Sequence, residues 1–351
     1  MTDPVPGARE PDQVRILGIE TTCDETAAAV FTAEPRVLSS AVASQAQLHA
    51  KFGGVVPEVA SRAHLQRLLP VIQEALDGAK TTFEELDAIA VCNRPGLVGS
   101  ILVGLSAAKA LAWTFGKPLL GVNHLEGHVY ACQMQRAESV FPCIALVASG
   151  GHTHLFRCQT PRDLELVGCT LDDAAGEAFD KVASMLGLGY PGGPAIEAAA
   201  KGGDPKAYDF PRTFLRDERL DFSFSGLKTA VRYALFGQNA QNADRPLSPA
   251  EVANAAASFQ AAAVEVLVGK CEQALRRFHL KKLCVGGGVA ANGAFRAALE
   301  KMAAKRHIDL TVPPLAWCTD NAAMAAVAVE RFRAGEFDPL DLDAIPGVLR
   351  P

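Results

Sequence analysis

The sequence lacks paired cysteines. Its 9 cysteines stand singly among 351 residues, and no Cys-x-x-Cys motif occurs. This spacing excludes a zinc ribbon and gives no disulfide framework. We therefore expect the cysteines to be small buried hydrophobic residues in a reducing compartment.

The sequence also lacks a positive net charge. It carries 34 Lys and Arg against 39 Asp and Glu, which gives a formal charge of -5 and a pI near 5.9. Bulk charge therefore does not attract nucleic acid, and any such contact must be local. Basic residues at helical spacing more often form a solvated helix face than a phosphate track. The candidates for a local contact are two clusters: Arg212, Arg216 and Arg219, and Arg276, Arg277, Lys281 and Lys282.

Long apolar segments are absent too. The opening MTDPVPGAREPDQ is polar and rich in proline, so we expect a flexible tail and no secretory signal. The longest run of small and apolar residues, 98–116, contains Lys109 and is short for a bilayer span, which favours a buried helix. With 49% hydrophobic and 21% charged residues, the composition is typical of a soluble globular protein. We expect a cytoplasmic protein without membrane contact.

Common catalytic and nucleotide-binding motifs are missing as well. The chain has no Gly-x-x-x-x-Gly-Lys-Ser/Thr loop, and the glycines at 286–288 do not give a Gly-x-Gly-x-x-Gly with an acidic ribose ligand in a plain dinucleotide-binding unit. It also has no His-Glu-x-x-His helix, the motif that supplies the general base of many zinc peptidases. These absences disfavour a P-loop, a plain dinucleotide-binding unit and a peptidase.

Two histidines at helical spacing are the most informative feature that is present. His124 and His128, in His-Leu-Glu-Gly-His, lie four residues apart and so on one face of a helix, which suits capture of a divalent metal by two neutral nitrogens. If the fold brings Asp320 alongside, the set becomes two histidines and one carboxylate, with positions left open for substrate or water. A chain with 8 histidines sometimes shows this spacing by chance or for capping, so spacing alone leaves the role open.

A strand, a polar turn and a second strand follow one another twice. Residues 14–31 contain two apolar runs around the polar turn 20–26, and residues 143–158 contain two around the turn 149–153. A duplicated opening predicts two similar α/β lobes. We expect further strands at 86–91, 119–122 and 282–285, and helices at 57–76, 98–115 and 174–186. A long helix is expected to begin after the capping box Ser248 to Glu251, and other helices to begin near Phe222, Asn292 and Asp320.

Three polar or glycine-rich loops follow expected strands, at residues 20–26, 149–153 and 286–288. Glycines let backbone N–H groups approach a phosphate or nucleoside closely. Any one of these loops taken alone is better explained as a tight turn or helix cap. Three together fit a nucleotide held between two lobes, as in actin, sugar kinases and heat-shock chaperones.

The ordered motifs of this chain resemble those of the TsaD family of tRNA threonylcarbamoyladenosine synthases, formerly called glycoproteases or O-sialoglycoprotein endopeptidases. The resemblance runs from about Arg15 to about Ala326 and is far more specific than the histidine spacing. The strings that carry it are GIETTCDETAAAV, GGVVPEVASRAH, GVNHLEGHVYA, SGGHT, DDAAGEAFDKVA, GYPGGP, DFSFSGLKT, VGGGVAAN and CTDNAAMAA.

This resemblance implies a two-lobed, actin-like α/β fold with duplicated lobes and a nucleotide cleft between them. It implies transfer of a threonylcarbamoyl group from threonylcarbamoyl-AMP to the exocyclic amine of the adenosine 3′ of the anticodon, in tRNAs that read codons starting with A. The domains expected are a flexible tail at 1–13, an N-terminal lobe at 14–133, a C-terminal lobe with the adenylate and metal residues at 134–325, and a segment at 326–351 that packs back on the first lobe.

The family motifs also assign roles to residues. His124, His128 and Asp320 would hold one divalent metal, iron or zinc, and Asp24 and Glu25 would form the acidic pair needed for transfer. The residues expected to contact the adenylate are Val147, Ala148, Ser149, Gly150, Gly151, Asp180, Gly193, Asn292 and, near the ribose, Glu197.

The chemistry of these residues agrees with the assignment. A metal can polarise the carbonyl of a carbamoyl-adenylate, and backbone N–H groups can stabilise the developing negative charge. An aryl amine is a poor nucleophile, so a carboxylate that accepts its proton would help, and Asp24 is the candidate base. The alternative roles are a turn-forming Asp24, an exposed charge at Asp180 and an N-cap at Asn292.

Two positions depart from the family pattern. Arg94 stands where the family usually has the first glycine of Gly-Pro-Gly-Leu, so we expect either a different turn or a contact of Arg94 with RNA or a partner. Ala148 stands where the phosphate loop usually has Val, which changes little.

Three other functions remain as alternatives. They are a metallopeptidase, a kinase or ATPase of the actin-like fold, and a non-catalytic partner subunit, which would be expected to lack the metal residues. For the transferase, the resemblance implies work with tRNA, a same-fold TsaB-like subunit and a small TsaE-like P-loop ATPase, while a separate enzyme makes the adenylate.

Overall fold

The computed structural model describes residues 10–237 and 245–347, and the chain divides into two compact units. Of the described residues, unit 1 contains 10–45, Val55–Met134 and 320–347. Unit 2 contains Ala46–Gly54 and Gln135–Thr319. The first nine residues of the expected tail lie outside the described part of the chain. The domain boundaries expected from the sequence stay a prediction.

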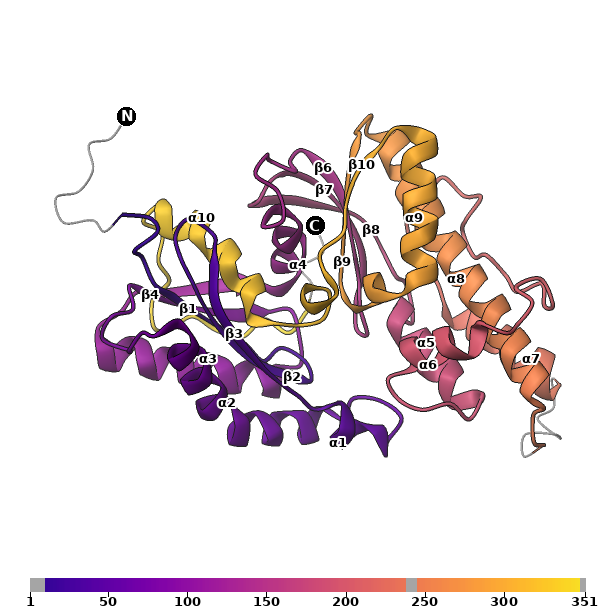
Figure 1. The fold of residues 1–351 in the computed structure, drawn as a ribbon, viewed down its shortest axis with the longest axis horizontal. Coiled ribbons are helices and arrows are strands. Elements are labelled where there is room, and N and C mark those ends of the chain that lie inside the picture. The colour runs from indigo at the N-terminus through magenta and orange to yellow at the C-terminus, as the bar shows by residue number, and fades with distance from the viewer. Residues whose placement is uncertain (1–9, 238–244, 348–351) are drawn as a thin grey trace. The chain divides into compact units, whose positions relative to one another are not determined.

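Unit 1 is built on a five-stranded sheet with the order β3-β2-β1-β4-β5 (Figure 1). The first three strands pair antiparallel, and β4 and β5 extend the sheet in parallel with β1. The strands are β1 (Ile16–Glu20), β2 (Glu25–Phe31), β3 (Val37–Ser44), β4 (Ala88–Arg94) and β5 (Leu119–Asn123).

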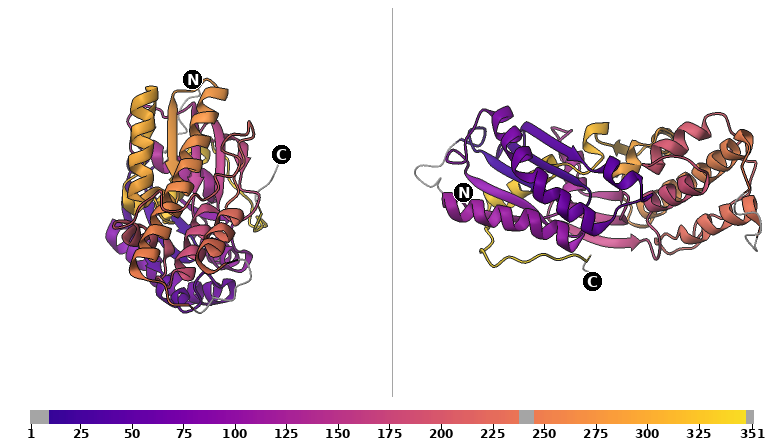
Figure 2. Two further views of the ribbon diagram at one scale, coloured as in Figure 1. Left: turned by 90° about the vertical axis from the view of Figure 1, so that its right-hand side faces the viewer. Right: turned by 90° about the horizontal axis from the view of Figure 1, so that it is seen from below.

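Both faces of this sheet are covered, which explains why β1 is an unbroken buried run. On one face Leu17 and Ile19 join the core formed with α2 (Pro57–Ala79) and α3 (Val98–Phe115). On the other face Ile16 joins a core formed with α4 (His124–Gln133), the 3-10 helix η3 (Ala322–Val327) and α10 (Ala328–Arg333). In the view from below in Figure 2, the purple helices α2 and α3 lie in front of the sheet.

Unit 2 repeats the same sheet, with the order β10-β9-β6-β7-β8. Again the first three strands pair antiparallel, and the last two extend the sheet in parallel from the first. The expected duplication and the α/β class are therefore confirmed. The strands are β6 (Cys143–Ala148), β7 (Thr153–Thr160), β8 (Asp163–Cys169), β9 (Lys282–Gly286) and β10 (Asp309–Thr311).

Helices pack on the apolar face of this second sheet. Its core joins Ile144, Leu146 and Val285 of the strands to side chains of the helices. The long helix starts at the predicted capping box, where Ser248 Oγ accepts a hydrogen bond from the Glu251 N–H. The helices are α1 (Ala46–Ala50), α5 (Ala175–Met185), α6 (Gly192–Ala200), α7 (Ser225–Phe236), α8 (Pro249–Arg277) and α9 (Gly293–Arg306), with short 3-10 turns η1 (Gly288–Ala291) and η2 (Leu315–Trp317).

Two helices, α3 and α8, have the length and apolar composition of a membrane span. Both supply buried side chains to the cores described above, Leu105 from α3 and Leu267 from α8 among them. Core helices of soluble proteins share these properties, so they are weak evidence for a membrane protein.

The segment after Asp320, expected to be one helix, begins as a 3-10 helix. The chain forms the 3-10 helix η3 before the short helix α10. Gly18 of β1 explains the tight packing there, because a Cβ at Gly18 would lie 2.9 Å from both the Ala322 carbonyl oxygen and the Ala325 Cβ. The close approach of η3 to the sheet is a tertiary feature that the local sequence pattern does not contain.

Candidate metal and adenylate sites

Helix α4 presents the two predicted histidines on one face. The helix begins directly after β5, where Asn123 caps it by accepting a hydrogen bond from the Leu125 N–H at 2.9 Å. His124 and His128 are 2% and 0% exposed, and their rings meet edge to face with centroids 4.7 Å apart. The four-residue spacing therefore produces a buried pair, as predicted.

The structure brings Asp320 to both histidines. Its Oδ1 lies 3.5 Å from His124 Nε2 and 3.3 Å from His128 Nε2. One ligand atom from each of the three residues falls within 4.8 Å of the others, the spacing of a group that could hold a metal ion. Asp320 follows η2 and precedes η3, so nearly two hundred residues of sequence separate it from α4.

A carboxylate that sequence analysis did not select orients His124 from behind. Glu20 Oε2 lies 2.9 Å from His124 Nδ1, and both side chains are buried. Thr22 Oγ1 lies 3.1 Å from the same nitrogen. These contacts at Nδ1 leave Nε2 facing Asp320, the arrangement in which a second carboxylate fixes the ring of a metal-binding histidine. The available signal was a Glu at the end of an otherwise apolar, buried strand.

The electrostatics of this group favour a bound positive charge. Burial alone would lower the pKa of His124, but the carboxylates of Asp320 and Glu20 outweigh it and raise that pKa to about 9. Burial raises the pKa of Glu20, and the neighbouring His124 more than offsets this, so the pKa is lowered overall. The pKa of His128 is lowered, mainly by burial and partly by the charge of His124. His124 therefore carries a proton and a positive charge at neutral pH, whereas His128 is neutral. A divalent cation can replace this proton beside the carboxylates of Glu20 and Asp320.

The residues present fit a metal ion. Nδ1 of the buried His128 lacks a hydrogen-bond partner among the described residues, and Nε2 faces Asp320 Oδ1 at 3.3 Å. A buried imidazole with an unsatisfied nitrogen is costly in a purely structural role, and a metal would bind one of its nitrogens. Two imidazoles and one carboxylate are a donor set that suits zinc or iron.

Asp24 is brought to the same group. Ligand atoms of Cys23, Asp24 and Asp320 lie within 4.8 Å of one another. Burial raises the pKa of the Cys23 thiol well above its ordinary value, and the nearby carboxylate of Asp24 adds to this. The thiol is therefore protonated at neutral pH.

Glu25 is the more perturbed acid of the expected pair. Its Oε1 accepts a hydrogen bond from Ser44 Oγ at 2.8 Å, while its Oε2 is buried without a partner among the described residues. Burial raises its pKa from 4.5 to about 7, the Ser44 hydrogen bond opposes this rise, and the negative charges of Asp24 and Asp320 add to it. A carboxyl group that titrates near neutral pH suits proton transfer.

His64 fixes the turn that carries both acids. Its Nε2 lies 3.0 Å from the Cys23 carbonyl oxygen and its Nδ1 lies 2.8 Å from Thr26 Oγ1. The ring is fully buried on α2, so it ties this helix to both ends of the segment with Asp24 and Glu25. The family motif GGVVPEVASRAH ends in His64, but the sequence alone assigned no role to that residue.

In unit 2, the predicted glycine-rich turns meet at the ends of β6 and β9. These strands are parallel neighbours, so the turns that follow them lie at one edge of the sheet. Gly287 has a φ of +90°, and a Cβ there would collide with the backbone of Ala148. Val147 and Ala148 are buried in β6, whereas a Cβ at Gly150 or Gly151 would meet nothing within 4 Å.

Hydrogen bonds connect the other residues expected near the adenylate. Asp180 of α5 accepts a 2.7 Å hydrogen bond from the Gly192 N–H, next to Gly193 at the start of α6. Glu197 of α6 accepts one from the Gly293 N–H at 3.0 Å, at the start of α9. The structure therefore gathers these residues within unit 2, and their contact with an adenylate stays a prediction.

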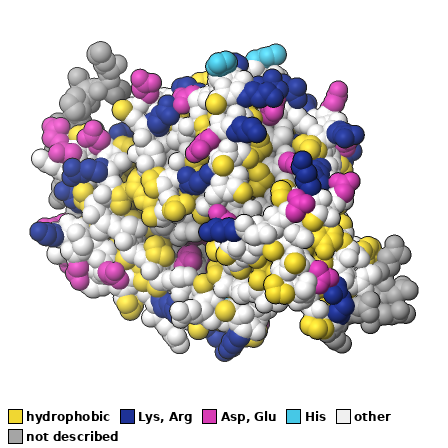
Figure 3. All heavy atoms as spheres, turned by 45° about the vertical axis from the view of Figure 1, so that its right-hand side comes forward, with side chains coloured by type: hydrophobic (Ala, Val, Ile, Leu, Met, Phe, Trp, Pro, Cys, Tyr) yellow, Lys and Arg dark blue, Asp and Glu magenta, His cyan; other side chains and the backbone are white. Residues whose placement is uncertain are grey.

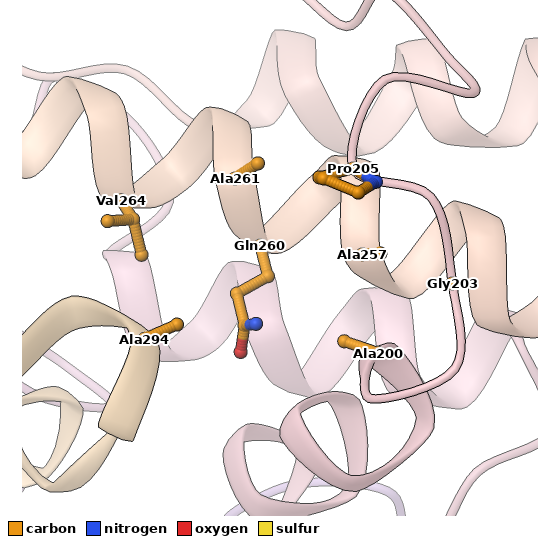
Figure 4. A pocket seen from close by; sticks show the side chains of 8 residues that line it. All are labelled: Ala200, Gly203, Pro205, Ala257, Gln260, Ala261, Val264 and Ala294. Atoms are coloured by element: carbon orange, nitrogen blue, oxygen red, sulfur yellow. The ribbon is translucent and has the colours of Figure 1, made fainter. Parts of the chain in front are cut away.

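Asn292 has the N-cap role considered above and a second contact. Its side-chain oxygen accepts a hydrogen bond from the Phe295 N–H at 2.9 Å, and its Nδ2 donates to Gln260 Oε1 at 2.8 Å. Gln260 faces a hollow of about 240 Å³ between α6, α8 and α9, shown in Figure 4. The other lining residues are small or apolar: Ala200, Gly203, Pro205, Ala257, Ala261, Val264 and Ala294.

Two of the family motifs meet at Asp172. Its carboxylate accepts hydrogen bonds from the N–H of Phe224 at 2.8 Å and from the hydroxyls of Ser223 and Ser225 at 2.6 and 2.7 Å. Burial raises the pKa of Asp172, but these hydrogen bonds lower it overall. The residue therefore anchors the start of α7, a structural role for both motifs.

Arg94 stands at the end of β4, where the pairing with β5 shifts register between Cys92 and Arg94. Its guanidinium donates to Asn93 Oδ1 at 3.1 Å. A glycine is required two residues later, at Gly96, where a Cβ would lie 2.7 Å from Thr22 Cβ. The expected difference in the turn, and the expected contact of Arg94 with RNA or a partner, stay predictions.

Comparisons with known proteins find relatives along almost the whole chain. The profile of the TsaD family, described as tRNA N6-adenosine threonylcarbamoyltransferase, matches residues 36–327. Proteins with that name from Rhodopirellula baltica and Symbiobacterium thermophilum are 51% and 53% identical to this chain. Each alignment covers 95% of this chain, and 97% and 96% of the respective relative.

Solved structures show the fold alone. The HypF structure from T.kodakarensis matches with a TM-score of 0.61 and 14% identity, over 93% of this chain and 49% of that one. Component A of the (R)-2-hydroxyglutaryl-CoA dehydratase of Acidaminococcus fermentans matches with a TM-score of 0.53 and 13% identity, over 92% and 98%. These likenesses confirm the expected actin-like fold.

Proposed function

This chain belongs to the TsaD family, and from that premise we propose that it transfers the threonylcarbamoyl group of threonylcarbamoyl-AMP to a tRNA adenosine. The acceptor is the exocyclic amine of the adenosine 3′ of the anticodon, in tRNAs that read codons starting with A. The product is N6-threonylcarbamoyladenosine.

The observation that carries this proposal is the buried group formed by His124, His128 and Asp320, with Asp24 beside it. Burying two histidines against carboxylates costs free energy unless these polar groups bind something, so the group is not expected in a protein of this fold that binds no metal or substrate there. The group supplies metal ligands and a proton acceptor in one place, as the transfer requires.

His124, His128 and Asp320 would hold one divalent metal, iron or zinc. When bound, the metal supplies Lewis-acid chemistry that polarises the carbonyl group under attack. Glu20 keeps His124 in the tautomer that offers Nε2 to the metal.

The other residues bind the adenylate and move the proton. Gly150 and Gly151 are exposed and a Cβ at either would meet nothing within 4 Å, which leaves room for a phosphate beside their backbone, and the apolar hollow beside Asn292 suits a purine ring. Asp180, Gly193 and Glu197 frame the same region of unit 2, with Val147, Ala148 and Ser149 leading into the turn. The amine becomes a competent nucleophile as Asp24 or Glu25 accepts its proton.

The test is a transfer assay with the purified chain, its two partners, threonylcarbamoyl-AMP and unmodified tRNA, with the modified nucleoside measured by mass spectrometry. We expect product that depends on the chain, on the adenylate and on tRNA. ATP hydrolysis without tRNA, or cleavage of a protein substrate, in the absence of transfer would instead support a kinase or peptidase. The out-of-register Glu126 disfavours the peptidase.

The partners proposed are tRNA, a same-fold TsaB-like subunit and a TsaE-like P-loop ATPase. An apolar surface on unit 1 supports a protein partner, because large hydrophobic side chains on helices α2 and α3 are left in solvent. Trp113 is 77% exposed, Leu65 69% and Leu69 64%, and Val98 and Leu102 continue the apolar side of α3. We propose that this helix pair docks the TsaB-like subunit, and that the complex works in the cytoplasm.

Replacing Leu65 and Leu69 by Asp is expected to abolish co-purification of the TsaB-like subunit. Both side chains are already exposed, so the isolated chain should keep its melting temperature within a few degrees. The matched control is Leu340→Asp, an exposed Leu of the same unit that belongs to neither helix. Undiminished co-purification of the double variant, measured by pull-down and size-exclusion chromatography, would assign the partner to another surface.

A further inference from the structure

Two basic segments of unit 2 stand out in an acidic chain. Residues 276–282 read RRFHLKK, and residues 301–307 read KMAAKRH. Together they hold seven of the 34 Lys and Arg residues and two of the 8 histidines, without a single Asp or Glu. The remainder of the chain is correspondingly more acidic than the net charge of -5 suggests.

The fold brings these segments side by side. Helix α8 ends at Arg277 and α9 ends at Arg306, and the two helices pack against each other. Lys281 Nζ reaches the Arg306 carbonyl oxygen at 3.5 Å, and Arg306 pairs with Glu272 of α8 at 2.5 Å. In Figure 3, histidine side chains lie beside a group of Lys and Arg side chains at the top of the view, the end at which α9 finishes and β10 starts in Figure 1.

Most of these charges have no acidic partner. Within the described residues, Arg276, Lys301 and Lys305 are exposed and form no ion pair. Two helix C-termini account for some of the basic residues, because cations there complement the helix dipoles. Lys281 and Lys282 lie beyond the end of α8, so dipole compensation does not account for the whole group. We call the exposed cations Arg276, Arg277, Lys281, Lys301, Lys305 and Arg306 the basic surface.

Two of the three arginines in the other cluster that the sequence offered are paired with carboxylates. Arg212 pairs with Glu265 at 2.8 Å, and Arg219 pairs with Asp217 at 3.3 Å. The same loop is held by the buried Lys270, which donates to the Arg219 carbonyl oxygen at 2.6 Å. Ion pairs within the protein compete with phosphate groups, so Arg212 and Arg219 are less available to RNA than the basic surface.

We propose that the basic surface binds the phosphate backbone of the RNA substrate, away from the modified base. This inference rests on the proposed function, because it takes the RNA to be the tRNA that accepts the threonylcarbamoyl group. Unpaired Lys and Arg on a protein with negative net charge are the local electrostatic footprint that RNA binding requires.

The position within unit 2 fits this role. Strand β9 begins at Lys282, beside the basic surface, and ends at Gly286, where the turn toward Asn292 and the expected adenylate site begins. A strand of five residues spans about 16 Å. RNA carries phosphates along its whole length. When one base lies near the adenylate, phosphates of neighbouring nucleotides are within reach of the end of the sheet at Lys282.

The test neutralises the three unpaired cations together, in Arg276→Gln, Lys301→Gln, Lys305→Gln. The control neutralises three cations of unit 2 that are each paired with a carboxylate, in Arg212→Gln, Arg219→Gln, Arg245→Gln, so that both variants have the same net charge. Binding of unmodified tRNA to the assembled complex is measured by fluorescence anisotropy over a range of salt concentrations, together with kcat and KM for tRNA. Thermal melting and co-purification of the partners check that each variant is folded and assembled.

We expect the first variant to bind tRNA about 10-fold more weakly or worse at 0.1 M salt, with a salt slope reduced by about 2, because roughly three phosphate contacts are lost. Its KM for tRNA should rise while kcat stays within about two-fold, and the control should resemble wild type. Unchanged binding by the first variant, equal weakening by the control, or loss of a partner subunit instead of tRNA would each overturn the proposal.

Failure of the proposed function would look different. A wild-type complex that binds tRNA through the basic surface but forms no threonylcarbamoyladenosine would refute the transferase assignment and leave the RNA-binding surface standing. Normal transfer by the wild-type complex, together with unchanged tRNA binding in the triple variant, would refute the RNA-binding surface and leave the transferase assignment standing. A wild-type complex that binds no tRNA would overturn both.

Discussion

A His128→Ala variant is expected to contain essentially no bound metal and to lose transfer activity by about 100-fold or more. The reason is that His128 Nδ1 has no partner among the described residues and Nε2 faces only Asp320, another member of the candidate metal site. Metal content is measured by inductively coupled plasma mass spectrometry and transfer by nucleoside mass spectrometry. Removing the ring breaks only its contact with Asp320, a residue of the site itself, so the fold should survive at a cost in packing.

His279→Ala is the matched control, since this side chain is exposed at the end of α8. It should retain both metal and activity. Full metal content together with normal transfer in His128→Ala would remove the ligand role of the histidine pair.

Glu20→Gln is expected to weaken metal binding without removing a ligand. Gln keeps an oxygen near His124 Nδ1 but removes the charge that Glu20 places 2.9 Å from that atom. Loss of such an outer carboxylate typically lowers metal affinity 10- to 100-fold. We therefore expect activity that returns at high metal concentration in Glu20→Gln, and activity that does not return in His128→Ala.

The contrast between these residues shows what the sequence could predict. His124 and His128 share a helix, and helical periodicity alone places them together. Asp320 was linked to them only through its family motif, and Glu20 was not linked at all, because its contact with His124 spans 104 residues of sequence. His64 was missed for the same reason: its partners Cys23 and Thr26 lie on another element.

The fold was predictable where the pattern is local. Two apolar runs around a polar turn gave the first hairpin of each sheet, and the capping box at Ser248 gave the start of α8. The strands β3, β8 and β10 were not expected. They are half exposed or only three residues long, so their apolar pattern is weak. The 3-10 helix η3 depends on the absence of a side chain at Gly18, a contact that becomes visible only in three dimensions.

The two expected acids differ in a way that pH can separate. A carboxylate accepts a proton only when it is ionised, and Glu25, with a pKa raised to about 7, is mostly protonated below pH 7 and mostly ionised above it. If Glu25 takes the proton of the amine, transfer by the wild type rises through pH 7 and levels off above it. A cation held near Asp320 would favour the ionised form and move the rise to lower pH.

Glu25→Gln is then expected to lower kcat by 100-fold or more and to abolish this rise, since general bases typically contribute 10²- to 10⁴-fold. Asp24→Asn, the matched neutral change at the neighbouring residue, should keep the rise if Glu25 is the base. If Asp24 is the base instead, Asp24→Asn suffers the large loss in kcat. Glu25→Gln would then retain most of its activity. Initial rates between pH 5.5 and 8.5, read as kcat and KM separately, make the distinction.

The same titration should appear in stability, measured without metal. Because the pKa of Glu25 is raised from 4.5 to about 7, ionising it costs the folded state free energy that the unfolded state does not lose. Relative to wild type, Glu25→Gln should therefore gain nothing from relief of this cost below pH 4.5. The gain should grow between pH 4.5 and 7 and be complete above pH 7, at no more than about 3 kcal/mol. Thermal melts of both proteins in chelator at pH 5 and pH 8 test this: a stability difference that does not change between the two pH values would mean that the Glu25 carboxyl is not held in a desolvated position.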